Sequence, residues 1–108
     1  MICKKKLNET MGRLGFRESL AGTRYIRAAC DMIDRDRHAM MCKEVYPTLA
    51  RSRSAATMAS VERAIRTAVE DAKRNPNWEE AWRGIGGTSC TYNSEVIHRL
   101  VNECQDEN

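Results

Sequence analysis

An apolar stripe between residues 61 and 72 constrains the fold of this chain more than any other feature. Small apolar residues recur there at intervals of three and four, which is the spacing of one face of an α-helix. The stripe consists of Val61, Ala64, Ile65, Ala68, Val69 and Ala72. The opposite face carries Glu62, Arg63, Arg66, Thr67, Glu70, Lys73 and Arg74. The pattern predicts an amphipathic helix over residues 61–74, capped by Thr57 or Ser54 and ended by Asn75-Pro76.

Similar periodicity predicts shorter helices along the rest of the chain. Residues 23–34 show the same spacing of apolar side chains, and Thr23 is a suitable N-cap. Asn77, followed three residues later by Glu80, resembles a capping box that opens another helix. The predicted helices cover residues 7–14, 23–34, 37–45, 47–51, 61–74, 77–83 and 93–104. Because β-branched residues never alternate along the chain, no strand is expected.

Length and composition limit the class of protein. A chain of 108 residues, with 42% hydrophobic and 31% charged residues, suits one globular domain. We therefore expect an all-α fold, a compact bundle of about six helices forming one domain over residues 1–108, with residues 1–6 and 105–108 frayed. The basic N-terminus lacks a following apolar stretch, and no apolar run is long enough for a membrane span, so the expected location is the cytoplasm.

The reactive residues give no support to catalysis or metal binding. The five cysteines are odd in number and form no CxxC pair, and Cys30, Cys42 and Cys104 fall within helical patterns as small packing residues. His38 and His98 have no Cys or His at metal-ligand spacing. The chain also lacks a phosphate-binding glycine loop and a nucleophile elbow. We expect no enzyme, no metal and no cofactor.

The order of elements around residues 47–74 is typical of a helix-turn-helix. A short helix, a polar stretch over residues 52–59 and an amphipathic helix follow one another. Arg63, Arg66 and Thr67 share one outward face of the predicted helix. The planar guanidinium of an arginine there can donate two hydrogen bonds to the O6 and N7 acceptors of guanine. Arg51 and Arg53 precede the helix and are suited to hold phosphates.

The residues alone leave an alternative open for the same face. Glu62 and Arg66 are spaced as a helical ion pair, and Arg63 could pair with Glu70. On that interpretation the face is an ordinary salt-bridged surface in contact with solvent. The net charge of +3 permits nucleic-acid binding without arguing for it.

Four segments of the chain resemble one family. They are Gly22-Thr23-Arg24-Tyr25-Ile26-Arg27-Ala28-Ala29, Tyr46-Pro47-Thr48-Leu49-Ala50, Val61-Glu62-Arg63-Ala64-Ile65-Arg66-Thr67-Ala68-Val69-Glu70 and Asn93-Ser94-Glu95-Val96-Ile97. In this order they resemble the C-terminal DNA-binding effector domain of the stage-zero sporulation response regulator of endospore-forming bacteria. The resemblance covers nearly the whole chain.

The resemblance implies a six-helix domain with a helix-turn-helix whose recognition helix reads a box of the TGNCGAA type. It implies that Glu62, Arg63, Arg66 and Thr67 face DNA, as does Ser60, which replaces a basic residue of the family. It further implies homodimers on tandem boxes, formed with elements of the last helix, and a contact with the RNA polymerase sigma subunit.

Three further departures from the family bear on function. The turn before the recognition helix is one residue longer, and residues 84–92, in the region that engages sigma, are shorter and rich in glycine. No receiver domain precedes the effector in this sequence. We therefore weigh two functions. The first is a sequence-specific DNA-binding transcriptional regulator with double-stranded DNA as partner. The alternative is an interaction module that does not read DNA and dimerises with or antagonises a full-length relative.

Overall fold

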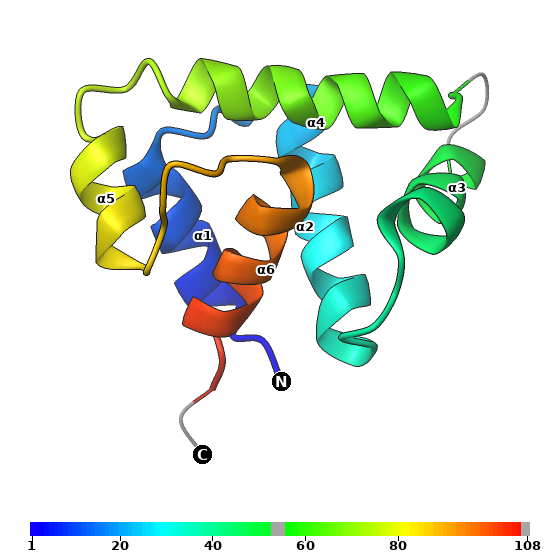
Figure 1. Ribbon diagram of the computed structural model, residues 1–108, viewed down its shortest axis with the longest axis horizontal. Coiled ribbons are helices and arrows are strands. Elements are labelled where there is room, and N and C mark those ends of the chain that lie inside the picture. The colour runs from blue at the N-terminus through cyan, green and yellow to red at the C-terminus, as the bar shows by residue number, and fades with distance from the viewer. Residues whose placement is uncertain (53–55, 107–108) are drawn as a thin grey trace.

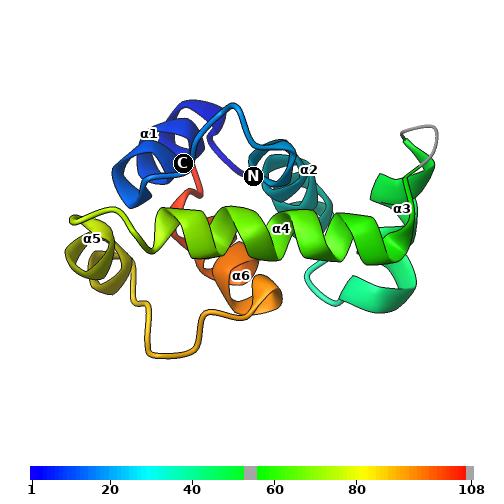
Figure 2. The same cartoon turned by 90° about the horizontal axis from the view of Figure 1, so that it is seen from above.

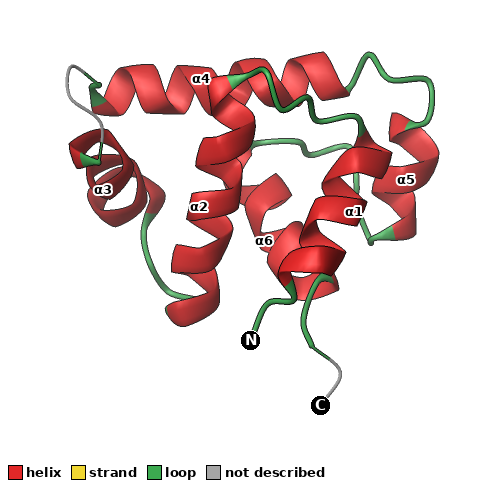
Figure 3. Cartoon of the chain, turned by 180° about the vertical axis from the view of Figure 1, so that it is seen from behind, coloured by secondary structure: helices red, strands yellow, loops and turns green. Residues whose placement is uncertain are grey.

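The computed structural model describes residues 1–52 and 56–106, which form six α-helices and a π-helical turn, without a strand (Figure 3). The elements are α1 (Lys4–Leu14), α2 (Ala21–Arg35), the π-helical turn η1 (Met41–Val45), α3 (Tyr46–Arg51), α4 (Met58–Ala72), α5 (Trp78–Gly84) and α6 (Asn93–Glu103). This confirms the predicted all-α bundle. Among the described residues, no helix has both the length and the apolar character needed to cross a bilayer.

Helix α4 spans one side of the molecule, and the other helices lie beneath it. Figure 1 shows α3 below its N-terminal end, α5 below its C-terminal end and α1, α2 and α6 between them. Seen from above in Figure 2, no other helix among residues 1–52 and 56–106 covers α4. Both chain ends lie on the opposite side of the bundle. The fold therefore leaves one long face of α4 open.

The inner face of α4 supplies the centre of the core. Val61, Ile65 and Ala68 are completely buried, whereas Ala64 at the edge of the predicted stripe is only partly buried. They pack with the stripes of α2 and α6, whose members include Ile26, Ala29, Cys30, Ile33, Val96, Ile97, Leu100 and Val101. Burial of each large aliphatic side chain stabilises the fold by about 1.5–3 kcal/mol. The stripe thus fixes which side of α4 faces solvent.

A glycine sets the crossing of α2 and α4. A Cβ atom at Gly22 would lie 1.9 Å from the Ala64 carbonyl oxygen and 2.8 Å from the Ala68 Cβ. The two backbones can approach this closely only because residue 22 has no side chain. The position of α4 above the core therefore depends on this residue.

One predicted helix and two predicted caps are wrong. Residues 36–40 are not helical, because Asp36 Oδ1 accepts a hydrogen bond from the His38 N–H (3.0 Å) and holds a local turn. Within the predicted range only residues 41–45 are helical, and they form the π-helical turn. Helix α2 begins earlier than expected, at Ala21, and the Thr23 hydroxyl donates to the Arg17 carbonyl oxygen (2.7 Å) instead of capping the helix. Asn77 makes no capping hydrogen bond through its side chain.

Hydrogen bonds join the two chain ends to each other and to α2. Ile2 is buried and pairs with Gln105 in an isolated antiparallel bridge. Asp34 joins both ends, since its carboxylate accepts from the Gln105 amide (3.0 Å) and from the Ile2 N–H (2.9 Å). These two hydrogen bonds lower the pKa of Asp34. These contacts hold Ile2 and Gln105 against the bundle, whereas residues 107–108 lie outside the described part of the chain.

The cysteines divide into buried and accessible groups. Cys30 and Cys104 are completely buried, as expected of packing residues, but Cys42 is exposed in the π-helical turn. Burial raises the pKa of both buried thiols. Among the described residues, no three His, Cys, Asp or Glu side chains gather as a metal site would require.

Candidate nucleic-acid interface

Helix α4 begins at a capping box that the sequence predicted only in part. The Thr57 Oγ1 accepts from the Ser60 N–H (3.0 Å), and the Ser60 Oγ accepts in return from the Thr57 N–H (2.9 Å). Thr57 is thus the N-cap, while the alternative cap Ser54 lies outside the described residues. Ser60, a predicted DNA-facing residue, is exposed but uses its hydroxyl to close the helix end.

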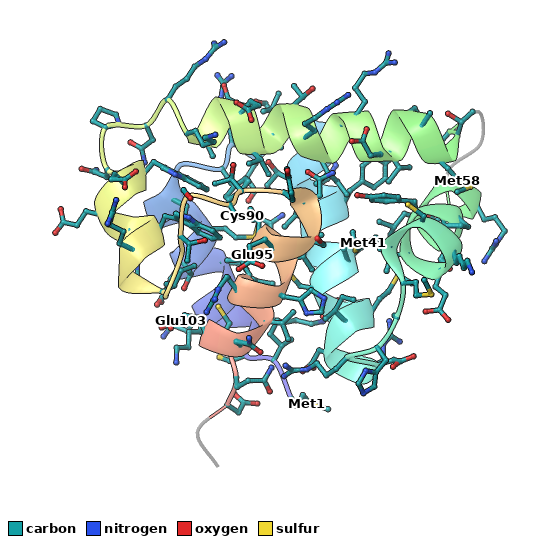
Figure 4. All side chains as sticks on the ribbon, in the orientation of Figure 1. Met1, Met41, Met58, Cys90, Glu95 and Glu103 are labelled. Atoms are coloured by element: carbon teal, nitrogen blue, oxygen red, sulfur yellow. The ribbon has the colours of Figure 1, made fainter. Side chains whose placement is uncertain are left out.

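Three predicted site residues lie together on the open face of α4. Arg63, Arg66 and Thr67 are all exposed. Arg63 forms no ion pair or hydrogen bond with any described residue. Figure 4 shows that side chains on the outer side of α4 project into open space. The guanidinium of Arg63 is therefore available to a ligand that approaches this face.

The salt-bridged surface considered as an alternative is present only in part. Arg66 lies 3.6 Å from Glu62, and their side chains are 58% and 37% exposed. Glu70 pairs with Lys73 at 3.7 Å instead of with Arg63. Exposed helical pairs of this kind contribute about 0.3–0.5 kcal/mol. Such weak pairing does not prevent Arg66 from taking another partner.

Of the two arginines predicted to hold phosphates, the structure describes only Arg51. Arg51 is exposed in the last turn of α3, where it donates to the Thr48 Oγ1 (3.2 Å). Helix α3 packs against α4, so Arg51 belongs to the same end of the molecule as the N-terminus of α4. Arg53 lies outside the described residues.

A hydrogen-bonded junction supports α4 from the side, and the sequence did not reveal it. The Asn93 amide donates to the Tyr46 hydroxyl (3.1 Å) and to the Glu62 carbonyl oxygen (3.2 Å). It thereby joins α3, α4 and α6 through polar groups that are partly buried. Burial raises the pKa of Tyr46 and keeps its hydroxyl neutral. Tyr46 and Asn93 both occur in the segments that carry the family resemblance. That resemblance was the one sign in the sequence that these residues matter.

The glycine-rich segment after α5 is a defined loop. The Trp82 indole N–H donates to the Thr88 carbonyl oxygen (2.7 Å). A Cβ atom at Gly87 would lie within 2.4 Å of three atoms of that indole ring, so the loop can wrap Trp82 only with glycine there. The loop is therefore held against α5 and leads directly into α6.

The short helix α3 is followed along the chain by the amphipathic helix α4, which has one open, arginine-bearing face. This order within an all-α bundle is the organisation of a helix-turn-helix domain. The family model described as "Sporulation initiation factor Spo0A C terminal" matches residues 7–104. The chain therefore belongs to this family of transcription-factor DNA-binding effector domains, which are not catalytic. The predicted resemblance is confirmed. No curated protein and no solved structure matches the chain.

Proposed function

We propose that this chain is a sequence-specific DNA-binding transcriptional regulator that places the outer face of α4 in the major groove. The observation that carries the proposal is the uncovered face of α4, on which Arg63 and Arg66 lie one turn apart and Arg63 has no partner among the described residues. A B-form major groove admits one α-helix, and none of the helices in the described part of the chain blocks that approach.

Each predicted side chain on this face suits a base or a phosphate. Arg63 and Arg66 can each donate two hydrogen bonds to guanine, Glu62 can accept from cytosine, and the Thr67 methyl can contact thymine. Arg51 is placed to hold a phosphate beside the groove. A bidentate contact with guanine discriminates by about 1–3 kcal/mol, which exceeds the weak attraction between Arg66 and Glu62.

Family membership supports two further partners. We infer that the domain binds tandem boxes as a homodimer and contacts the RNA polymerase sigma subunit. The argument for both is the family resemblance, which implies that the region around the loop 85–92, between α5 and α6, contacts sigma. A regulator of this class acts in the compartment that holds the DNA.

Titration of labelled duplexes tests DNA reading. One duplex carries a TGNCGAA box and the other a scrambled box of the same length, and each is measured at two salt concentrations. We expect Arg66→Ala to raise Kd for the box about 5- to 150-fold and to reduce the preference for it. Arg83→Ala is the matched control, because Arg83 is an exposed arginine on α5 paired only with Glu79.

Two results would decide against the proposal. If Arg66→Ala leaves the preference for the box intact, Arg66 does not read a base. If the unaltered chain binds neither duplex at either salt concentration, the domain is an interaction module that does not read DNA. Sedimentation with and without a relative that carries the same domain then measures that second function.

A further inference from the structure

Three arginines outside the predicted reading face gather where α1 and α4 end. Arg13 lies in the last turn of α1, Arg17 follows in the next loop, and Arg74 lies two residues after the end of α4. All three line one groove of about 450 Å³. We call this group the arginine corner.

Contacts between the two helix ends fix the arginine corner relative to α4. The Asn75 amide donates to the Arg13 carbonyl oxygen (3.2 Å). Gly15 has a φ of 100°, and a Cβ there would lie 2.6 Å from the Asn75 Cβ, so this close contact requires glycine. Arg17 binds Asp71 of α4 through Nε (2.9 Å) and one terminal nitrogen (2.8 Å). The corner therefore moves with α4 as one unit.

The donors of the arginine corner remain available. Arg74 is exposed, and its guanidinium forms no ion pair or hydrogen bond with a described residue. Arg13 donates only a long hydrogen bond to the Thr10 Oγ1 (3.3 Å). Arg17 is 62% exposed, and its contact with Asp71 leaves one terminal nitrogen free to donate. With Asp71 as the carboxylate in the groove, the corner carries an excess of positive charge.

The arginine corner adjoins the reading face. Arg17 and Arg74 also line a second groove, of about 320 Å³, together with Arg66 and Thr67. Arg74 follows Arg63 by 11 positions, which corresponds to about 16 Å along a helix axis and about three full turns. The major groove is about 12 Å wide, so a helix with Arg63 at a base edge brings Arg74 to the phosphates that border the groove.

We propose that the arginine corner binds backbone phosphates of duplex DNA beside the box that α4 reads. The proposal rests on the proposed DNA-binding function and extends its contact area to the end of α1. Phosphates carry no sequence information, so the corner adds affinity and fixes the register of α4 without changing which box is preferred. Asp71 orients Arg17 for this contact by holding one edge of its guanidinium.

The test compares Arg74→Ala and Arg13→Ala with Arg83→Ala, which removes the same charge from α5. Each variant is titrated with box and scrambled duplexes over a range of salt concentrations. Loss of one phosphate contact lowers the salt slope by about 0.9 and weakens binding about fivefold at 0.15 M salt. We expect Arg74→Ala to show both effects equally on the two duplexes, and Arg83→Ala to show neither.

Shortened duplexes locate the contact. We expect removal of the base pairs flanking the box on one side to weaken the unaltered chain but to have little further effect on Arg74→Ala. An unchanged salt slope in Arg74→Ala and Arg13→Ala would overturn the phosphate assignment, and so would a changed preference for the box. If Arg74→Ala and Arg13→Ala bind like the unaltered chain while Arg66→Ala loses its preference for the box, the phosphate assignment is wrong and the proposed function stands. Absence of any DNA binding by the unaltered chain overturns both.

Discussion

Replacement of Gly22 by alanine tests whether the close crossing of α2 and α4 sets the position of α4. The new Cβ would lie 1.9 Å from the Ala64 carbonyl oxygen. Ordinary contact begins at 3.4 Å, so the helices must separate by about 1.5 Å, against a backbone atom that cannot rotate away. Overpacking of a core costs about 1–3 kcal/mol, and we expect the upper end of that range here. For a domain of this size, about 3 kcal/mol lowers Tm by about 12–24 °C.

Gly12→Ala supplies the matched control for this prediction. Gly12 lies in α1, and a Cβ there meets no atom within 4 Å, so alanine should stabilise the helix by about 0.5–1 kcal/mol. Thermal and urea unfolding measure both variants under the same conditions. If Gly22→Ala unfolds at the same temperature as the unaltered chain, the helices do not cross as closely as argued. If both variants are equally destabilised, the effect belongs to glycine replacement in general.

Two further predictions concern the chain ends and the thiols. Asp34→Asn should cost about 1–2 kcal/mol of unfolding free energy at neutral pH, because an acceptor for the Ile2 N–H or the Gln105 amide is lost. The lowered pKa of Asp34 contributes stability above its ordinary value of 3.8, so the difference between the two chains should be constant at higher pH and shrink as the pH falls below 3.8. Alkylation read by mass spectrometry should label Cys42 first and Cys30 only after unfolding, because the first is exposed and the second is buried with a raised pKa. Equal labelling rates, or a pH-independent difference for Asp34→Asn, would contradict these arguments.

The sequence predicted the elements whose apolar spacing is long and regular. The stripe on α4 extends over three turns, and the structure buries Val61, Ile65 and Ala68 as expected. The predicted helix over residues 37–45 was wrong because one local hydrogen bond, accepted by Asp36 from the His38 N–H, outweighs a weak helical preference. A side chain that accepts a hydrogen bond from a backbone N–H two residues further on leaves no periodic signal in the sequence, so pattern reasoning does not detect it.

The candidate site divides in the same way. The outward direction of Arg63, Arg66 and Thr67 follows from helical spacing, and the exposed side chains agree with it. The arginine corner depends instead on where the end of α1 meets the end of α4, a contact between residues about sixty positions apart. Single-sequence patterns carry no information on such contacts.

The contacts that support α4 do not involve the arginines of its open face. Gly22 approaches the Ala64 carbonyl, Asn93 donates to the Glu62 carbonyl, and Arg17 binds the Asp71 carboxylate. These three contacts are made with backbone or acidic groups of α4, so none of them involves an arginine of its open face. Weakening one of these contacts should therefore shift the whole of α4 and reduce the affinity for box and scrambled duplexes equally. Asn93→Ala tests this: a selective loss of the box would show that Asn93 contributes to reading and not to support.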